Sequence, residues 1–142
     1  MRTLEEIEKD IEKTRKHLRE LYDENNLALE REVNIDKNKY YTFHSPDDED
    51  IVYTGKVFNY WRDSKGEYQF EVTGIEECFS DIQDSCWAGF DAMHIIVVYN
   101  GQLDNFLNGF TEITKEEFDK KVNDVCVNMK KWINYWIESS II

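Results

Sequence analysis

The 142-residue chain has few of the residues that break or cross-link a fold: one proline, six glycines and three cysteines. Cys78, Cys86 and Cys126 are odd in number and widely spaced. We therefore expect reduced thiols in a cytoplasmic protein, and no disulfide framework. No glycine or proline occurs in the first 45 residues, so nothing there interrupts a long helix.

Long apolar runs are also missing. No window reaches eighteen consecutive apolar residues, so we expect no membrane-spanning helix and no membrane partner. The segment from Met1 to Ile7 is charged and has no apolar core. It therefore does not have the pattern of a signal peptide.

The sequence lacks the glycine-rich phosphate-binding loops and the H-E-x-x-H zinc motif. Cys78, Cys86 and His94 are spaced eight residues apart, whereas structural zinc sites bring their ligands in close pairs. A Cys–His nucleophile, Cys86 or Cys78 with His94 or His44, would need a base within hydrogen-bond reach and an oxyanion site, and the sequence indicates neither. We therefore expect a non-enzymatic protein with no catalytic residues, no metal and no cofactor.

Positive charge is scarce: 17 Lys and Arg stand against 30 Asp and Glu, for a net charge of −13. Residues 1–38 carry −3 and the remainder carries −10. Such a surface repels phosphate backbones, so direct nucleic-acid binding is not expected, whereas a basic protein partner would suit it. Solubility alone is the simpler reading of this charge. The acidic residues expected to meet a partner are Asp47, Asp48, Glu49, Asp50, Glu76, Glu77, Asp81 and Asp84.

A heptad pattern is the clearest feature that is present. From Leu4 to Ala28, residues at alternating spacings of three and four fill the a and d positions of a coiled coil. Thr3 is placed to cap this helix. We expect a coiled-coil helix over residues 1–35 that forms a homodimer or higher homo-oligomer; the same stripe could instead pack on its own domain. The predicted contact residues are Leu4, Ile7, Ile11, Leu18, Leu21 and Asn25.

Residues 39–113 have the composition of a small antiparallel sheet or partly open barrel. We expect strands at 39–43, 51–61, 67–72, 94–99 and 110–113. The stretch 75–93 is ambiguous and is read as strand to Phe79 and then loop. Thr114 and Glu117 form a capping box for an amphipathic helix over 114–138 that packs on the sheet. The predicted fold class is α+β.

Aromatic residues cluster in the second predicted strand. Because side chains alternate along a strand, Phe58 and Tyr60 would share one face and Trp61 would lie on the other. Tyr60 and Trp61 are candidates for stacking on a ligand. The alternative is that the aromatic face belongs to the core.

Lys39-Tyr40-Tyr41 and Ile113-Thr114-Lys115-Glu116-Glu117-Phe118 give the chain a resemblance to short uncharacterised proteins of phages and gut bacteria. That group has a leading coiled coil, a small SH3-like β-domain and a final helix. The resemblance implies a phage-type accessory origin, with action in the host cytoplasm.

We therefore expect an acidic interaction protein, one role being inhibition of a host defence factor by nucleic-acid mimicry. The alternatives are a protein that sequesters a signalling nucleotide and a structural virion or assembly component.

Overall fold

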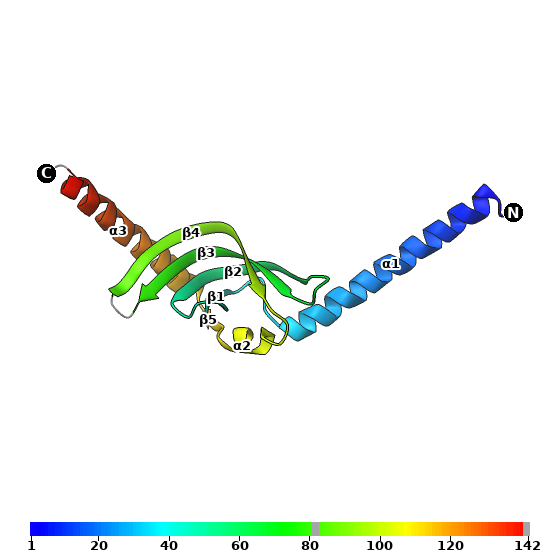
Figure 1. Ribbon diagram of the computed structural model, residues 1–142, viewed down its shortest axis with the longest axis horizontal. Helices are drawn as coiled ribbons and strands as arrows, with labels where there is room; N and C mark the ends of the chain where they lie inside the picture. The colour runs from blue at the N-terminus through cyan, green and yellow to red at the C-terminus, as the bar shows by residue number, and fades with distance from the viewer. Residues whose placement is uncertain (81–82, 141–142) are drawn as a thin grey trace. The chain divides into compact units, whose positions relative to one another are not determined.

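The computed structural model describes residues 1–80 and 83–140, together with all side chains in those ranges except those of 80, 83–87 and 140 (Figure 1). The chain divides into two compact units, Met1–Ile35 and Asp36–Ile142. The first is a single helix, and the second contains a sheet and two helices.

Helix α1, Leu4–Val33, confirms the long helix predicted from the sequence. The Thr3 hydroxyl accepts a hydrogen bond from the Glu6 backbone N–H at 3.2 Å. The Glu5 and Lys9 side chains pair one turn apart at 3.7 Å. The helix ends at Asn34, whose left-handed conformation lets its N–H donate to the Glu30 carbonyl.

The second unit is built on a five-stranded sheet of order β4-β3-β2-β1-β5, and every neighbouring pair of strands is antiparallel. The strands are β1 (Tyr40–His44), β2 (Ile51–Arg62), β3 (Tyr68–Ser80), β4 (Gln83–Val98) and β5 (Thr111–Ile113). The sheet is open and is not closed into a barrel (Figure 1). The α+β class is thus confirmed.

The hairpin of β3 and β4 is much longer than the sequence indicates. The predicted strand over 94–99 is present but begins much earlier, and the predicted loop is wrong from Gln83 onward, because β4 runs from Gln83 to Val98. Serine and aspartate favour turns in isolation. Here they lie in a segment whose backbone pairs with β3 along most of its length, and this pairing outweighs local preference. A short helix after the Asn100-Gly101 turn, α2 (Leu103–Asn108), was not predicted either.

One face of the sheet carries the main aromatic core. The Phe43 ring stacks on Phe110 at 4.2 Å and meets Phe106 of α2 edge-on at 5.8 Å. Phe70 also lies against Phe106, at 5.1 Å. Phe43 and Phe70 are fully buried. Helix α2 therefore closes this face, which we call the α2 face.

A β-bulge at Phe58 alters the predicted alternation of aromatic residues. In the register of β2 with β3, Val57 faces Val72 and Asn59 faces Glu71, so Phe58 is an extra residue. The insertion turns Tyr60 to the α2 face, where it is buried, and leaves Phe58 exposed. Phe58 and Tyr60 thus do not share a face.

Helix α3, Lys115–Ser140, packs on the opposite face of the sheet through its first half. Phe118 stacks on Tyr40 at 4.6 Å, Val125 is buried, and Lys121 reaches Glu77 of β3 at 2.8 Å. The capping box is present, since the Glu117 N–H donates to the Thr114 hydroxyl at 3.0 Å and the Glu117 carboxylate accepts from the Thr114 N–H at 3.4 Å. Of the described helices, none has an apolar stretch long enough to cross a bilayer.

Candidate functional site

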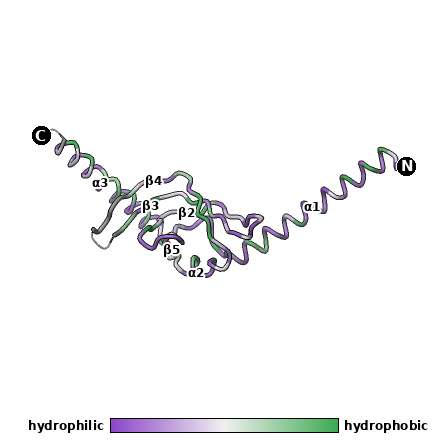
Figure 2. Tube along the Cα trace, in the orientation of Figure 1, coloured by the Kyte–Doolittle hydropathy of each residue, from purple (hydrophilic) through white to green (hydrophobic). Residues whose placement is uncertain are grey.

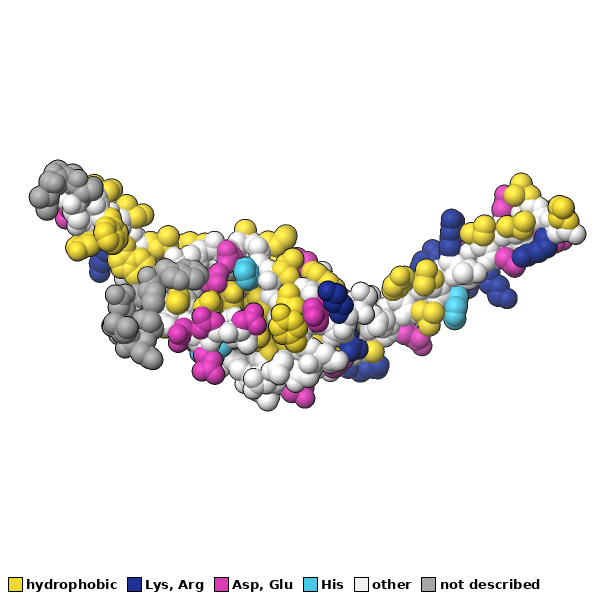
Figure 3. Space-filling model, in the orientation of Figure 1, with side chains coloured by type: hydrophobic (Ala, Val, Ile, Leu, Met, Phe, Trp, Pro, Cys, Tyr) yellow, Lys and Arg dark blue, Asp and Glu magenta, His cyan; other side chains and the backbone are white. Residues whose placement is uncertain are grey.

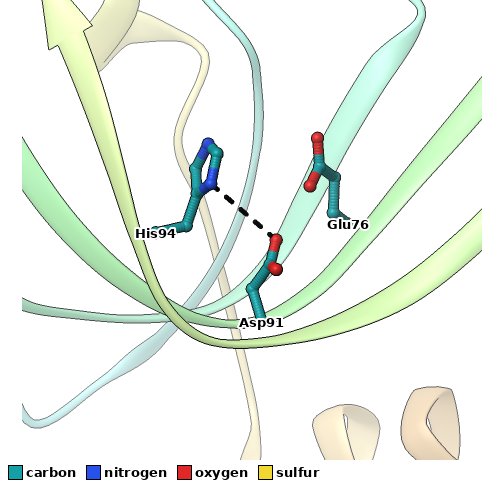
Figure 4. A group of neighbouring side chains, drawn as sticks. All are labelled: Glu76, Asp91 and His94. Atoms are coloured by element: carbon teal, nitrogen blue, oxygen red, sulfur yellow. Dashed lines mark ion pairs between the residues drawn. The ribbon is translucent and has the colours of Figure 1, made fainter.

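The α2 face has a polar end where four titratable side chains meet. Tyr53 of β2 and Glu76 of β3 are register partners and therefore lie side by side. Asp91 and His94 approach them from β4 (Figure 4). One ligand atom from each of Glu76, Asp91 and His94 lies within 4.8 Å of the others, and all three side chains are half-buried. We call Glu76, Asp91 and His94 the carboxylate–histidine cluster.

A second β-bulge assembles this cluster. Residues three apart in a regular strand point to opposite faces, so Asp91 and His94 would normally be separated by the sheet. In the register of β3 with β4, Val72 faces His94 and Gly74 faces Asp91, so β4 advances by three residues while β3 advances by two. The extra residue puts Asp91 and His94 on the same face.

Tyr53 holds the cluster in place. Its ring is stacked between Phe43, at 5.5 Å, and the His94 imidazole, at 5.4 Å. Its hydroxyl donates to Glu76 Oε1 at 3.3 Å and lies 3.1 Å from His94 Nε2. Because the single hydroxyl proton is given to Glu76, Nε2 carries the proton that completes the second hydrogen bond. In the neutral imidazole, the lone pair of His94 then resides on Nδ1, which lies 3.9 Å from Asp91 Oδ2.

Burial and the closeness of the two carboxylates shift the pKa values of Glu76 and of Tyr53. Burial, and then the hydrogen bond and negative charge of Asp91, raise the pKa of Glu76 above its ordinary value. Burial, and then the charge of Glu76, raise the pKa of Tyr53, so its hydroxyl keeps its proton. A cavity of about 10 Å³ beside the cluster, lined in part by Tyr53, Gly74 and Asp91, has room for about one water.

The predicted self-association residues all lie at the surface. The a and d side chains of α1 form an exposed stripe, Leu4 at 72% and Leu18 at 48% of their full exposure. Figure 2 shows hydrophobic residues recurring along α1, and Figure 3 shows them gathered on the side drawn there. The remaining predicted contacts Ile7, Ile11, Leu21 and Asn25 are exposed as well.

The predicted acidic surface is divided by the fold. Asp47, Asp48, Glu49 and Asp50 are exposed in the loop between β1 and β2. The Asp48 carboxylate accepts a hydrogen bond from the Asp50 N–H at 2.9 Å, and the Asp50 carbonyl accepts one from the Phe79 N–H at 2.7 Å, so this acidic loop has a defined backbone. Glu76 belongs to the cluster.

Two further predicted acidic positions lie outside the described residues and side chains, namely Asp81 and Asp84. Glu77 is 6% exposed and its carboxylate is paired with Lys121 beneath α3. It is therefore a buried residue that joins α3 to the sheet, and not part of an acidic surface.

The two predicted stacking residues lie on opposite faces. Tyr60 is buried in the core, near Phe70 at 6.0 Å and beneath the Lys37 ammonium at 4.7 Å. Its ring is thus not available to a ligand, which corrects the sequence-based expectation. Trp61 is half-buried.

Sequence reasoning considered His94 only with Cys78 and Cys86, because those residues are evenly spaced. It missed Asp91 and Tyr53 altogether. The D-x-x-H spacing in β4 is visible in the sequence, but it indicates a shared face only once the bulge is known.

No protein-family model, no curated protein and no solved structure matches this chain.

Proposed function

We propose that this chain is a self-associating, non-enzymatic interaction protein whose α1 helix pairs with α1 of a second copy. The observation that carries this proposal is the exposed stripe of aliphatic a and d side chains along α1. Leaving several such side chains in water costs free energy that pairing in a coiled coil recovers. The separation of Met1–Ile35 as its own compact unit favours such a role for α1.

Polar residues of α1 favour α1 of a second copy as its partner, with the two helices parallel. Asn25 falls at an a position, where an asparagine is best satisfied by the same residue of a parallel partner. In the same arrangement Asp10 at g faces Arg15 at e of the second chain. A foreign apolar helix would not meet both requirements.

Replacement of Leu18 and Leu21 by glutamine tests this proposal, with Leu27→Gln as the matched control. Leu27 is an exposed leucine of the same helix, but it lies at a c position outside the stripe. By light scattering at micromolar concentration, we expect a dimer or larger oligomer for the wild type and for Leu27→Gln, and a monomer for the double variant. A wild-type monomer of 17.0 kDa would contradict the proposal.

We further propose that Asp47, Asp48, Glu49 and Asp50 bind a basic surface on a protein partner. These four carboxylates are adjacent, exposed and held in an ordered loop, and Asp and Glu can substitute for the phosphates that a basic groove would otherwise bind. Inhibition of a nucleic-acid-binding host factor would be one use of such mimicry.

Charge-matched variants test the acidic loop. One variant converts its four carboxylates to amides, and the control does the same to four exposed acidic residues elsewhere: Asp104, Glu116, Asp119 and Glu138. A partner purified with the wild type at low salt should be retained by the control, lost from the loop variant and released as salt is raised. Equal loss from both variants would show that only net charge matters and would contradict a local site.

A further inference from the structure

We propose that Glu76, Asp91 and His94 bind a divalent first-row transition-metal ion on the α2 face of the sheet. The proposal is independent of self-association. Its first support is the donor set, because one imidazole and two carboxylates converge from two strands to within 4.8 Å. Imidazole suits zinc and its neighbours in the first transition row, whereas Mg²⁺ and Ca²⁺ prefer all-oxygen sites.

The hydrogen bonds of Tyr53 direct the imidazole to act as a ligand. Metal-binding histidines commonly donate their second ring N–H to a neighbouring acceptor, which fixes the tautomer and the ring orientation. Here His94 Nε2 is bonded to the Tyr53 hydroxyl at 3.1 Å, and that hydroxyl donates to Glu76 at 3.3 Å. The Nδ1 lone pair is therefore left for a cation, and Tyr53 is a positioning residue.

The distance between donors fits a cation and does not fit a hydrogen bond. His94 Nδ1 lies 3.9 Å from Asp91 Oδ2, beyond hydrogen-bond range. Zinc bonds to nitrogen and oxygen are about 2.0–2.2 Å each, so two donors at this separation can bind the same ion at an angle wider than tetrahedral. Any pair of donors near the 4.8 Å limit of the cluster must move closer together on binding.

No lysine or arginine of the described residues neutralises the two carboxylates of the cluster: across residues 1–80 and 83–140, none forms an ion pair with Glu76 or Asp91. Two crowded carboxylates repel each other, and a dication would replace this repulsion with attraction. The side chains of Asp91 and His94 are each 37% exposed, which leaves room for water to complete the coordination.

The bulge in β4 is the second, independent support. It interrupts the regular pairing of β3 with β4 in the part of β3 between Val72 and Gly74. It also brings together two donors that a regular strand would place on opposite faces of the sheet. Bulges are frequent at sheet edges, where β4 lies, and beside active sites, where they re-aim a side chain. The Thr73 hydroxyl donates to the Asp91 carbonyl at 3.2 Å and so supports the bulged segment.

The decisive experiment is calorimetric titration of the EDTA-treated full chain with ZnCl₂, MnCl₂, MgCl₂ and CaCl₂. We expect one Zn²⁺ per chain, with Mg²⁺ and Ca²⁺ at least tenfold weaker. Asp91→Asn and His94→Gln should each weaken Zn²⁺ binding at least tenfold. The matched controls His44→Gln, at an exposed histidine of β1, and Glu71→Gln, on the other face of β3, should not change it. Unchanged binding in both cluster variants would overturn the proposal.

Two further measurements distinguish the cluster from the thiols and from the remaining histidines. Because thiolates also bind zinc, the titration is repeated with Cys78→Ser, and loss of binding in that variant would overturn the assignment. In the wild type, Zn²⁺ should shift the imidazole NMR resonances of His94 before those of His17 and His44, a result that needs no variant to fold. Earlier shifts at His17 or His44 would contradict the site.

Tyr53→Phe tests the positioning role. The variant keeps the ring stacked between Phe43 and His94 but removes the hydroxyl. Zn²⁺ binding should weaken by about tenfold or more. The ¹⁵N shifts of His94, which report the tautomer, should move away from the Nε2–H form. An unchanged tautomer would show that the hydroxyl does not direct the ring.

Discussion

Gly55 and Gly74 are the residues at which the sheet tolerates least change. They are register partners in β2 and β3, and their strands approach so closely that no side chain fits. A Cβ built on Gly74 would lie 2.2 Å from the Thr54 carbonyl oxygen, and one on Gly55 would lie 2.0 Å from that of Thr73. Gly74 also has a φ of +151°, which side-chain-bearing residues rarely adopt.

Gly74→Ala should therefore lower the free energy of unfolding by about 3 kcal/mol or more, through backbone displacement and strain. Gly89→Ala is the matched control in β4, since a Cβ there meets nothing within 4 Å. Urea denaturation followed by circular dichroism measures both. Similar losses in the two variants would show that the close approach of the two strands is not the cause.

At the scale of elements, α3 is joined to the sheet by an ion pair within an otherwise apolar contact. The Lys121 ammonium lies 2.8 Å from Glu77, and also 6.0 Å from the centre of the Phe79 ring. The Glu77 side chain is 8% exposed and that of Lys121 is 37% exposed. Removal of the lysine alone would leave a buried carboxylate without its cation, which is more costly than absence of the pair.

Lys121→Met should lower the free energy of unfolding by about 1–3 kcal/mol, less than for a fully buried pair because Lys121 is partly in water. The double variant Glu77→Leu/Lys121→Met should recover most of this loss, since two apolar side chains replace two charges. Thermal and urea unfolding compare the variants. A double variant no more stable than Lys121→Met would show that the buried charge is not the source of the loss.

The apolar side chains in the second half of α3 are more exposed to solvent than those in the first half. Its apolar side chains Ile133, Tyr135, Trp136 and Ile137 are all more than half exposed, whereas Phe118 and Val125 lie against the sheet or are buried. The sequence pattern therefore marked one apolar face along the whole helix, but the sheet covers only the part near its beginning.

For the whole molecule, the net charge of −13 gives the two proposed interactions opposite responses to salt. Two copies of the same acidic chain repel each other, and this repulsion acts over about 30 Å at 10 mM salt but only about 8 Å at 150 mM. An acidic loop and a basic partner attract each other over the same distances.

Self-association should therefore strengthen between 10 and 150 mM NaCl, while binding of a basic partner should weaken. Sedimentation at several protein concentrations measures the first, and titration with the purified partner measures the second. Self-association that weakens with added salt would show that contacts between opposite charges, such as Asp10 with Arg15 of the second copy, outweigh the repulsion between the two acidic chains.

The sequence by itself determined the long α1 helix, the capped α3 helix, the strand β1 and the α+β class. Each of these depends on patterns among neighbouring residues: heptad spacing, capping boxes and strand composition. Such patterns express backbone preferences that act within a few residues, so they can be read without the fold.

Only the tertiary structure decided the length of β4, the burial of Tyr60 and Glu77, and the meeting of Glu76, Asp91 and His94. The two bulges account for much of this difference. One extra residue reverses the face of every side chain that follows, and its position depends on pairing between strands and not on local sequence. A carboxylate from β3 and two donors from β4 could become neighbours only after that register was set.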